Sequence, residues 1–164
     1  IMQSTFEARP MAISFTWCPV TTIYYSSVGI FTWDGDDTIA ISNLSQNITG
    51  GEGTDTVTFH LSELVRDGFE IDLLNGDFKS DNSLQNSTIS DFENIYVKSI
   101  NAVKFIANEL TNVLSSGNGD DHLIAAGAAN ILIGNGGADT FEINSELATF
   151  WPLPCLISVR AKLL

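Results

Sequence analysis

The stretch GGEGTDTVT, Gly50 to Thr58, places three glycines and an aspartate within six residues and then continues as an alternating, β-prone segment. Glycine reaches positive φ angles and lets a second backbone approach closely, so the first six residues are typical of a tight turn. The last three residues set one apolar side chain between two polar ones, which predicts a short strand with a single inward side chain. Such a nine-residue unit cannot bury its own apolar face and needs neighbouring units to stack on.

The same unit recurs along the chain at multiples of nine residues. TWDGDDTIA (32–40), which begins eighteen residues before Gly50, keeps the glycine, the aspartate and the apolar residue at the fourth, sixth and eighth positions. Between them, ISNLSQNIT (41–49) keeps only the apolar residue and has Gln46 in the aspartate position. In the second half, six residues at intervals of nine are expected to point into the core: Tyr96, Phe105, Leu114, Leu123, Leu132 and Phe141. The residues two positions earlier, where the aspartate belongs, are Asn94, Val103, Asn112, Asp121, Asn130 and Asp139.

This periodicity predicts an all-β fold, a β-solenoid of two short repeat arrays separated by an irregular insertion. Two units form an eighteen-residue repeat, and successive repeats stack so that two parallel sheets face each other across a thin core. Residues eighteen apart then lie on the same side, which places Asp37 over Asp55 in the first array and Asp121 over Asp139 in the second. The other side of each array has lost this pattern.

The charge of the chain indicates cations as partners. It has 20 acids against 7 Lys+Arg, a net charge of −13, and residues 31–146 hold 19 of the acids with four bases, a net charge of −15. This charge argues against nucleic acid and anionic membrane surfaces, since phosphates would repel it. Carboxylates stacked about 5 Å apart, the spacing of neighbouring strands, repel each other unless a positive ion lies between them. Hard oxygen donors at this density favour Ca²⁺, whereas zinc would need clustered His or Cys.

These residues resemble the RTX family of calcium-binding nonapeptide repeats, whose pattern is G-G-x-G-x-D-x-U-x. GGEGTDTVT matches that pattern in full, and SGNGDDHLI (116–124) and GNGGADTFE (134–142) each lack one of the two leading glycines. The resemblance covers residues 32–142. It implies a parallel β-roll with Ca²⁺ held between the turns of successive repeats. It also implies a secreted, extracellular protein, usually of a Gram-negative bacterium, with type I secretion machinery as a partner.

The resemblance further implies two ligand sets. In the family pattern, the upper turn of each pair provides the carbonyl oxygens of its second and fourth positions and its aspartate, and the lower turn provides those of its first and third positions and its aspartate. The first site would comprise Trp33, Gly35, Asp37, Gly50, Glu52 and Asp55. The second site would comprise Gly117, Gly119, Asp121, Gly134, Gly136 and Asp139. Only the four aspartate side chains have metal-binding chemistry that is evident without the family, and Trp33, in place of a glycine, is expected to distort the first site.

The chain is predicted to divide into five segments. They are an apolar flank or N-terminal cap (1–31), the first array (32–58), an insertion with a strand and a polar loop (59–88), the second array (89–142) and an unassigned tail (143–164). FEIDLL (69–74) is the strand and NGDFKSDNS (75–83) the polar loop of the insertion. The insertion breaks the nine-residue spacing and is expected to bulge from the sheets or to pair with their edge. The uncharged run 10–33 contains two prolines and is rich in Ser and Thr, so no membrane span is expected there.

No enzymatic activity is predicted, because His60 and His122 are far apart and belong to no recognisable motif. His122 occupies the seventh position of its unit and is expected to face solvent. The sequence therefore predicts a calcium-binding module that folds after export. Two alternatives remain open. One is the C-terminal fragment of a larger secreted enzyme, such as a metalloprotease, lipase or epimerase, and the other is a metal-free β-solenoid that serves as an adhesin or structural segment.

Overall fold

The computed structural model of the chain describes residues 13–14, 29–32, 34–41, 47–59, 69–80, 83–127, 129–144 and 158–161. Every regular element in these ranges is a β-strand, and most neighbouring strands are parallel, so the predicted all-β class is confirmed. No helix in the described part of the chain is long and apolar enough to cross a membrane.

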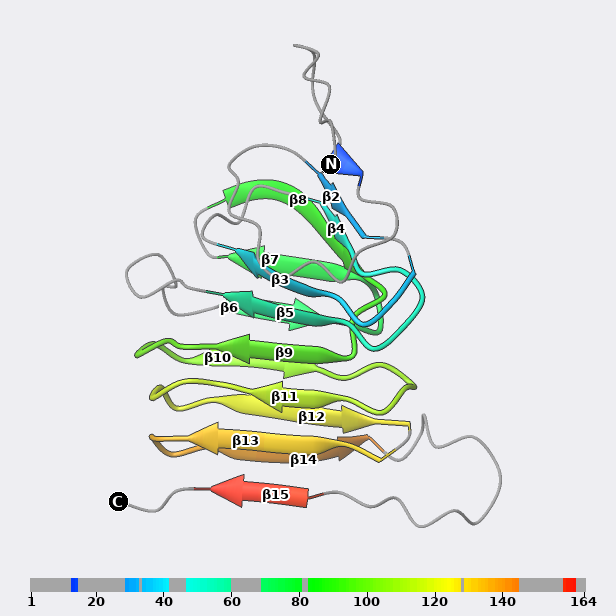
Figure 1. Ribbon diagram of the computed structural model, residues 1–164. Helices are drawn as coiled ribbons and strands as arrows, with labels where there is room; N and C mark the ends of the chain where they lie inside the picture. Colours follow the sequence, from blue (N-terminus) through cyan, green and yellow to red (C-terminus); the bar gives the residue numbers. More distant parts are fainter. Residues whose placement is uncertain are drawn as a thin grey trace.

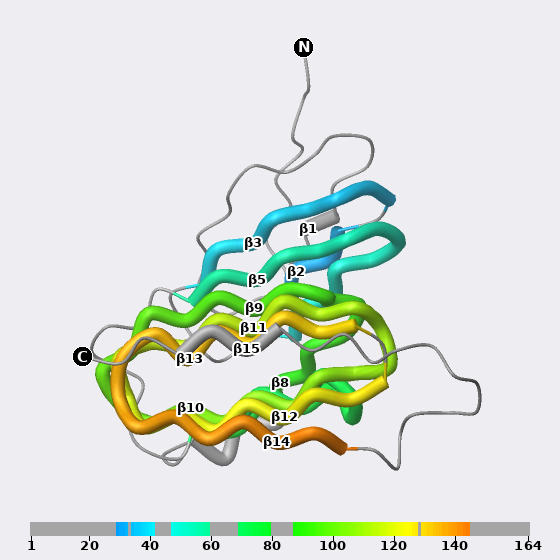
Figure 2. The backbone as a smooth tube through the Cα atoms, turned by 90° about the horizontal axis from the view of Figure 1, so that it is seen from below, coloured from blue at the N-terminus to red at the C-terminus, as the bar shows by residue number. Residues whose placement is uncertain are grey.

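The strands form two sheets that lie face to face, as Figures 1 and 2 show. The six-stranded sheet has the order β15 (Ser158–Ala161), β13 (Ile131–Asn135), β11 (Val113–Ser115), β9 (Asn94–Val97), β5 (Thr56–Phe59) and β3 (Thr38–Ile41). The nine-stranded sheet has the order β1 (Ile13–Ser14), β2 (Ile30–Phe31), β4 (Ile48–Thr49), β8 (Ser83–Ser90), β7 (Asp77–Ser80), β6 (Phe69–Asp72), β10 (Val103–Ile106), β12 (His122–Ala126) and β14 (Thr140–Asn144). From β9 to β14, consecutive strands alternate between the two sheets (Figure 1).

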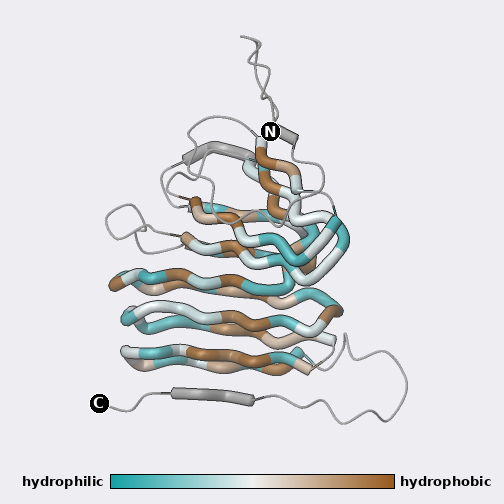
Figure 3. Tube along the Cα trace, in the orientation of Figure 1, coloured by the Kyte–Doolittle hydropathy of each residue, from teal (hydrophilic) through white to brown (hydrophobic). Residues whose placement is uncertain are grey.

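The register of the parallel strands follows the eighteen-residue spacing of the sequence. Five neighbouring pairs share this offset: Ile30 with Ile48, Ile39 with Val57, Phe105 with Leu123, Leu114 with Leu132, and Leu123 with Phe141. The apolar residue at the eighth position of each unit therefore stacks on its equivalent in the next repeat. This stacking produces a continuous apolar core, and Figure 3 shows hydrophobic and hydrophilic residues alternating along the strands.

One predicted core residue is wrong. Leu114 pairs with Ile95 rather than with Tyr96. Ile95 is fully buried, whereas Tyr96 is 39% exposed on the outer face of the sheet. The connection from β9 to β10 contains one residue more than the nine-residue spacing allows, and a shift of one residue in a strand moves every side chain to the opposite face. The sixth position of this unit is accordingly Glu93 and not Asn94, as its hydrogen bonds show below.

The insertion lies inside the nine-stranded sheet, which differs from the expected bulge or edge pairing. β6 and β7 form an antiparallel hairpin, β8 pairs with β7 on one side and with β4 on the other, and β6 pairs with β10. Part of the stretch expected to be a polar loop thus forms β7. In the opposite sheet, β5 pairs directly with β9, with Val57 beside Ile95. The two repeat arrays are therefore continuous in the six-stranded sheet.

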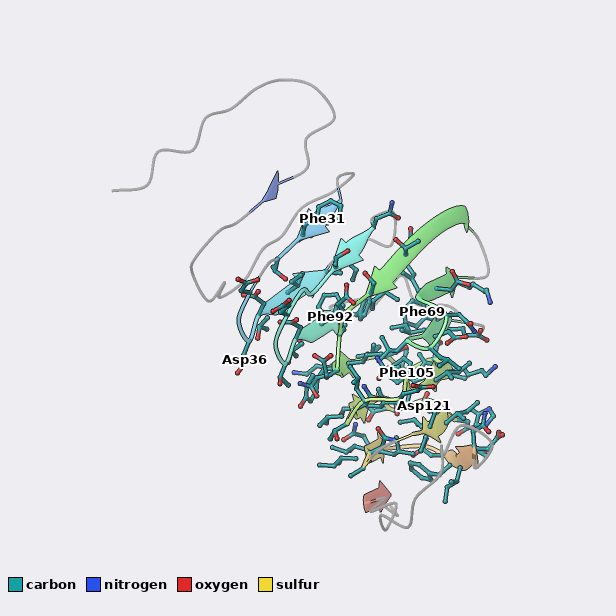
Figure 4. All side chains as sticks on the ribbon, turned by 90° about the vertical axis from the view of Figure 1, so that its right-hand side faces the viewer. Phe31, Asp36, Phe69, Phe92, Phe105 and Asp121 are labelled. Atoms are coloured by element: carbon teal, nitrogen blue, oxygen red, sulfur yellow. The ribbon has the colours of Figure 1, made fainter. Side chains whose placement is uncertain are left out.

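Phenylalanines fill the core where the insertion widens it. Phe59 packs edge to face against Phe69, with ring centroids 5.7 Å apart, and against Phe78 at 6.3 Å. Phe92 and Phe105 are also fully buried, and Figure 4 labels both within the stack of strands. These aromatic side chains provide the large buried apolar surface that the single inward residue of a three-residue strand cannot provide alone.

Candidate metal centre

A ladder of hydrogen bonds links the acidic residues that precede β3, β5 and β9. The Asp37 backbone amide donates to Asp55 Oδ1 at 2.7 Å, and the Asp55 amide donates to Glu93 Oε2 at 2.6 Å. All three side chains are buried, with exposed fractions of 3%, 0% and 9%. Asp37 and Asp55 thus lie one above the other, as expected, and Glu93 continues the column below them.

A second ladder lies at the start of β10, β12 and β14. The Val103 amide donates to Asp121 Oδ1 at 2.9 Å, and the Asp121 amide donates to Asp139 Oδ1 at 3.1 Å. Because these strands belong to the nine-stranded sheet, Asp121 and Asp139 lie at the opposite edge of the molecule from Asp37 and Asp55. The two predicted aspartate pairs are therefore both formed, one beside the N-terminal ends of the strands of each sheet.

Asparagines continue the first ladder beyond Glu93. The Asn112 amide donates to Asn130 Oδ1 at 2.9 Å, in the same geometry as the aspartates. Their side-chain NH₂ groups donate as well, from Asn130 Nδ2 to the Ala126 carbonyl at 2.7 Å and from Asn112 Nδ2 to the Glu93 carbonyl at 3.1 Å. An asparagine thus supplies its own donors, which a carboxylate cannot do.

The glycine-rich turns of the two aspartate pairs have matching hydrogen bonds. The Thr32 hydroxyl donates to the Gly50 carbonyl, and the Ser116 hydroxyl donates to the equivalent Gly134 carbonyl at 3.1 Å. In the fifth position, Asp36 Oδ1 accepts from the Thr54 amide at 2.8 Å, and Asp120 Oδ1 accepts from the Ala138 amide at 2.7 Å. Sequence reasoning missed these hydroxyl and fifth-position contacts. Both upper turns nevertheless begin with Thr or Ser and have an aspartate directly before the sixth-position aspartate (Figure 4 labels Asp36 and Asp121).

Three buried side-chain oxygens of the described residues form no hydrogen bond. Two belong to carboxylates, Oδ2 of the fully buried Asp55 and Oδ2 of Asp121, whose residue is 1% exposed, and the third is the amide oxygen of Asn112. A buried carboxylate oxygen without a donor is costly, because the charge has lost its water and gained nothing in return. The two carboxylate oxygens without a donor would therefore be available as ligands for a cation.

The electrostatics of both aspartates agree with this deficit. Burial raises the pKa of Asp55 to about 6, the hydrogen bond from the Asp37 amide opposes this rise, and the nearby Glu93 and Asp37 carboxylates add to it. Burial likewise raises the pKa of Asp121 to about 6, the nearby Ser116 hydroxyl and the Val103 amide offset the rise in part, and the Asp139 carboxylate adds to it. The Ser116 hydroxyl itself donates to the Gly134 carbonyl and not to Asp121 Oδ2. Basic side chains do not relieve the charge, because the ion pairs of the described residues are Lys79–Glu70, Lys104–Glu70 and His122–Glu142.

Glycine is required where the carboxylate of an aspartate packs against the first residue of its own turn. A Cβ on Gly134 would lie 2.0 Å from Asp139 Oδ2, and one on Gly50 would lie 2.7 Å from Asp55 Oδ2. Gly53 and Gly137 both have positive φ angles, and a Cβ on either would lie within 2.3 Å of the carbonyl oxygen of the turn above. The first and fourth positions are therefore glycine because a carboxylate or a second backbone occupies the space of a side chain.

The carbonyl oxygens predicted as ligands also hold the turns together. Glu52 O accepts from the Gly35 amide at 2.7 Å, and Gly117 O accepts from the Gly136 amide at 3.1 Å. Each carbonyl keeps a second lone pair. The carbonyls of Gly35 and Gly119 face Gly53 and Gly137 at close range. Trp33 lies outside the described residues, as does Gln46.

The donor set is consistent with a hard cation. The described residues contain no group of three or more His, Cys, Asp or Glu side chains arranged to hold a metal, so carboxylates alone would not complete a site. Two carboxylates from adjacent turns together with backbone carbonyls would provide oxygen donors only, which is the chemistry that Ca²⁺ prefers. His122, by contrast, lies on the outer surface, 3.0 Å from Glu142, as its position in the repeat predicts.

Comparisons of this chain with protein-family models, with curated proteins and with solved structures find no match in any of the three.

Proposed function

We propose that this chain is a calcium-binding module of the RTX type, secreted by a bacterium, whose two sheets form a parallel β-roll that folds when Ca²⁺ binds. The observation that supports this proposal best is the pair of buried aspartates, Asp55 and Asp121, each with one oxygen that no hydrogen bond satisfies. The alternation of strands between two sheets and the eighteen-residue register are what a β-roll requires.

The same residues explain why folding would depend on calcium. At neutral pH the unfolded chain keeps Asp55 and Asp121 ionised in water, whereas the folded chain buries both. Bound Ca²⁺ supplies the positive charge that these carboxylates lack. A ligand that binds only the folded state stabilises that state in proportion to its concentration over its dissociation constant. In a cell, where free calcium is scarce, the chain would remain unfolded and suited to export, and outside the cell it would fold.

A metal-free structural segment is the second candidate, and the asparagine ladder favours it. Asn112 and Asn130 stack in the same way as the aspartates, and the Asn130 side chain satisfies its own hydrogen bonds. Asn112 Oδ1 also has no hydrogen-bond partner, but a neutral amide buries no net charge that a cation would have to balance. If the whole chain behaved like this part, it would be a stable β-solenoid, suited to a role as an adhesin or a stalk.

Thermal unfolding of the full chain separates the two candidates. Calcium should raise the midpoint temperature relative to chelator, and magnesium should not, because Mg²⁺ demands a tight octahedron and gives up its water reluctantly. Asp121→Asn with Asp139→Asn should reduce the calcium effect, whereas Glu109→Gln, at an exposed position, should leave it unchanged. An unfolding temperature that is equal in calcium and in chelator would favour the metal-free candidate.

A further inference from the structure

The free oxygen of Asp55 faces the turn below it, and that turn is not one of the glycine-rich repeats. The turn consists of Asp91, Phe92 and Glu93, between the end of β8 and the start of β9. It replaces the six-residue turn that joins β4 to β5 in the repeat above. Asp91 has a φ angle of 59°, in the left-handed region, which allows the chain to reverse in three residues.

Two oxygens meet beside the Cα atom of Gly50. The position of a Cβ on Gly50 lies 2.7 Å from Asp55 Oδ2 and 1.8 Å from the carbonyl oxygen of Asp91. These two oxygens can therefore be no more than 4.5 Å apart, the distance reached if they lay on opposite sides of that point. The absence of a side chain on Gly50 is what brings them together.

Glu93 adds a carboxylate to the same place. Its Oε2 atom accepts the Asp55 amide at 2.6 Å, and among neighbouring carboxylates it contributes most to the raised pKa of Asp55. Glu93 is 9% exposed, and it forms no ion pair with a basic side chain of the described residues.

This arrangement is equivalent to the second aspartate pair. Asp121 accepts an amide from the repeat above through Oδ1, has an orphaned Oδ2, and donates its own amide to the carboxylate of Asp139 below. Asp55 does the same, with Glu93 in the place of Asp139. The carbonyl of Asp91 takes the place of the Gly134 carbonyl. Each follows a strand residue whose carbonyl accepts a hydrogen bond from the turn above, Ser90 from the Gly50 amide and Ile133 from the Ser116 amide.

We propose that Asp55 Oδ2, the Asp91 carbonyl oxygen and the Glu93 carboxylate form a further divalent-cation site between the first repeat array and the turn that ends the insertion. The inference rests on the proposed function, because it assumes that the ladders bind a hard cation. It goes beyond that function because it places an ion between Asp55 and Glu93, which are 38 residues apart in the sequence. The nonapeptide pattern places no ion there. Such an ion would fasten the insertion to the array.

Calorimetric titration of the full chain with CaCl₂ tests the inference. Glu93→Gln keeps an acceptor for the Asp55 amide but removes the charge, and it should lower the number of bound ions by one relative to wild type. Glu109→Gln removes the same charge from an exposed position and should not change that number. Asp121→Asn should also remove one ion, independently of Glu93→Gln, because the two sites lie at opposite edges of the molecule.

The possible results separate this inference from the proposed function. If wild type binds calcium and Glu93→Gln binds the same number of ions with the same affinity, the inference is wrong and the proposed function stands. If wild type shows no calcium binding, both are wrong. Should Glu93→Gln fail to fold, crystals of wild type grown with Tb³⁺ decide the matter. An anomalous peak beside Asp55 Oδ2 and the Asp91 carbonyl supports the inference, and a map with a peak only at Asp121 and Asp139 overturns it.

Discussion

The Asp37 backbone amide donates a hydrogen bond of 2.7 Å to Asp55 Oδ1, across one eighteen-residue repeat. The same carboxylate therefore has two roles. One oxygen joins successive repeats through the backbone, and the other is left free in a buried position. Asp121 has the same division of roles at the opposite edge of the molecule.

This division predicts different effects for two substitutions of Asp121. In chelator at neutral pH, Asp121→Asn should stabilise the protein, because it removes a buried charge and keeps the acceptor for Val103. The new amide can donate to the Gly117 carbonyl, as Asn130 donates to the carbonyl four residues before it. Asp121→Ala removes the same charge but leaves the buried Val103 amide without a partner, so it should be less stable than Asp121→Asn by about 1–3 kcal/mol. The fraction of folded protein in chelator, followed by far-UV circular dichroism, compares the two variants, and an alanine variant at least as folded as the asparagine variant would contradict the structural role of Oδ1.

The raised pKa values of Asp55 and Asp121 predict how stability depends on pH without calcium. Both groups bind a proton more tightly in the folded state, at about 6, than in the unfolded state, near 3.8. Their contribution to stability is therefore complete below the unfolded value and is lost as the pH rises through about 6. Each group accounts for at most about 3 kcal/mol.

Circular dichroism in chelator should consequently show more folded protein at about pH 5 than at about pH 7.5. Added calcium should reverse the trend, because protons and the cation compete for the same carboxylates. The double variant Asp55→Asn with Asp121→Asn should flatten the dependence on pH. A chelated wild type that becomes more stable as the pH rises would contradict the assignment of these two groups.

Two glycines of one turn should respond differently to alanine. A Cβ on Gly134 would lie 2.0 Å from Asp139 Oδ2 and 2.9 Å from its Cβ, so Gly134→Ala should displace this aspartate from its ladder. Overpacking of this kind costs about 1–3 kcal/mol, and calcium affinity should fall with it. Gly136→Ala is the matched control, since its nearest contact is the flexible amide oxygen of Asn118 at 3.0 Å. Equal unfolding free energies for the two variants would argue against the described position of Asp139.

Ile95 and Tyr96 should differ sharply when each is replaced by alanine. Ile95 is fully buried between the sheets, so Ile95→Ala should cost about 2–5 kcal/mol of unfolding free energy. Tyr96 is 39% exposed on the outer face, and Tyr96→Ala should cost less than about 1 kcal/mol. Urea unfolding in saturating calcium measures both values. A larger cost at Tyr96 than at Ile95 would mean that Tyr96 points into the core, as the uninterrupted nine-residue spacing predicts, and would contradict the pairing of Leu114 with Ile95.

The sequence predicted what depends on a regular repeat. The eighteen-residue register, the pairing of Asp37 with Asp55 and of Asp121 with Asp139, and the inward leucines all follow from the nine-residue pattern. It could not predict what depends on irregular connections. The extra residue after β9 reverses the faces of Ile95 and Tyr96, and a periodic count cannot detect one added residue.

Glu93 was missed for a related reason. It joins the ladder of Asp55 only because a three-residue turn and an insertion within the opposite sheet bring β9 beside β5. The 38 residues that separate Asp55 from Glu93 are no multiple of nine, so the sequence has no periodic signal for this contact. A long-range pairing across an insertion is fixed by the packing of the whole sheet rather than by any local pattern.

The most direct test of the central claim is far-UV circular dichroism of the full chain during a calcium titration, with magnesium as the control. The account predicts little β signal in chelator at neutral pH, a cooperative rise with calcium alone, and reversal when chelator is added again. A spectrum that is fully β in chelator and does not change with calcium would contradict it, and the chain would then be a metal-free β-solenoid.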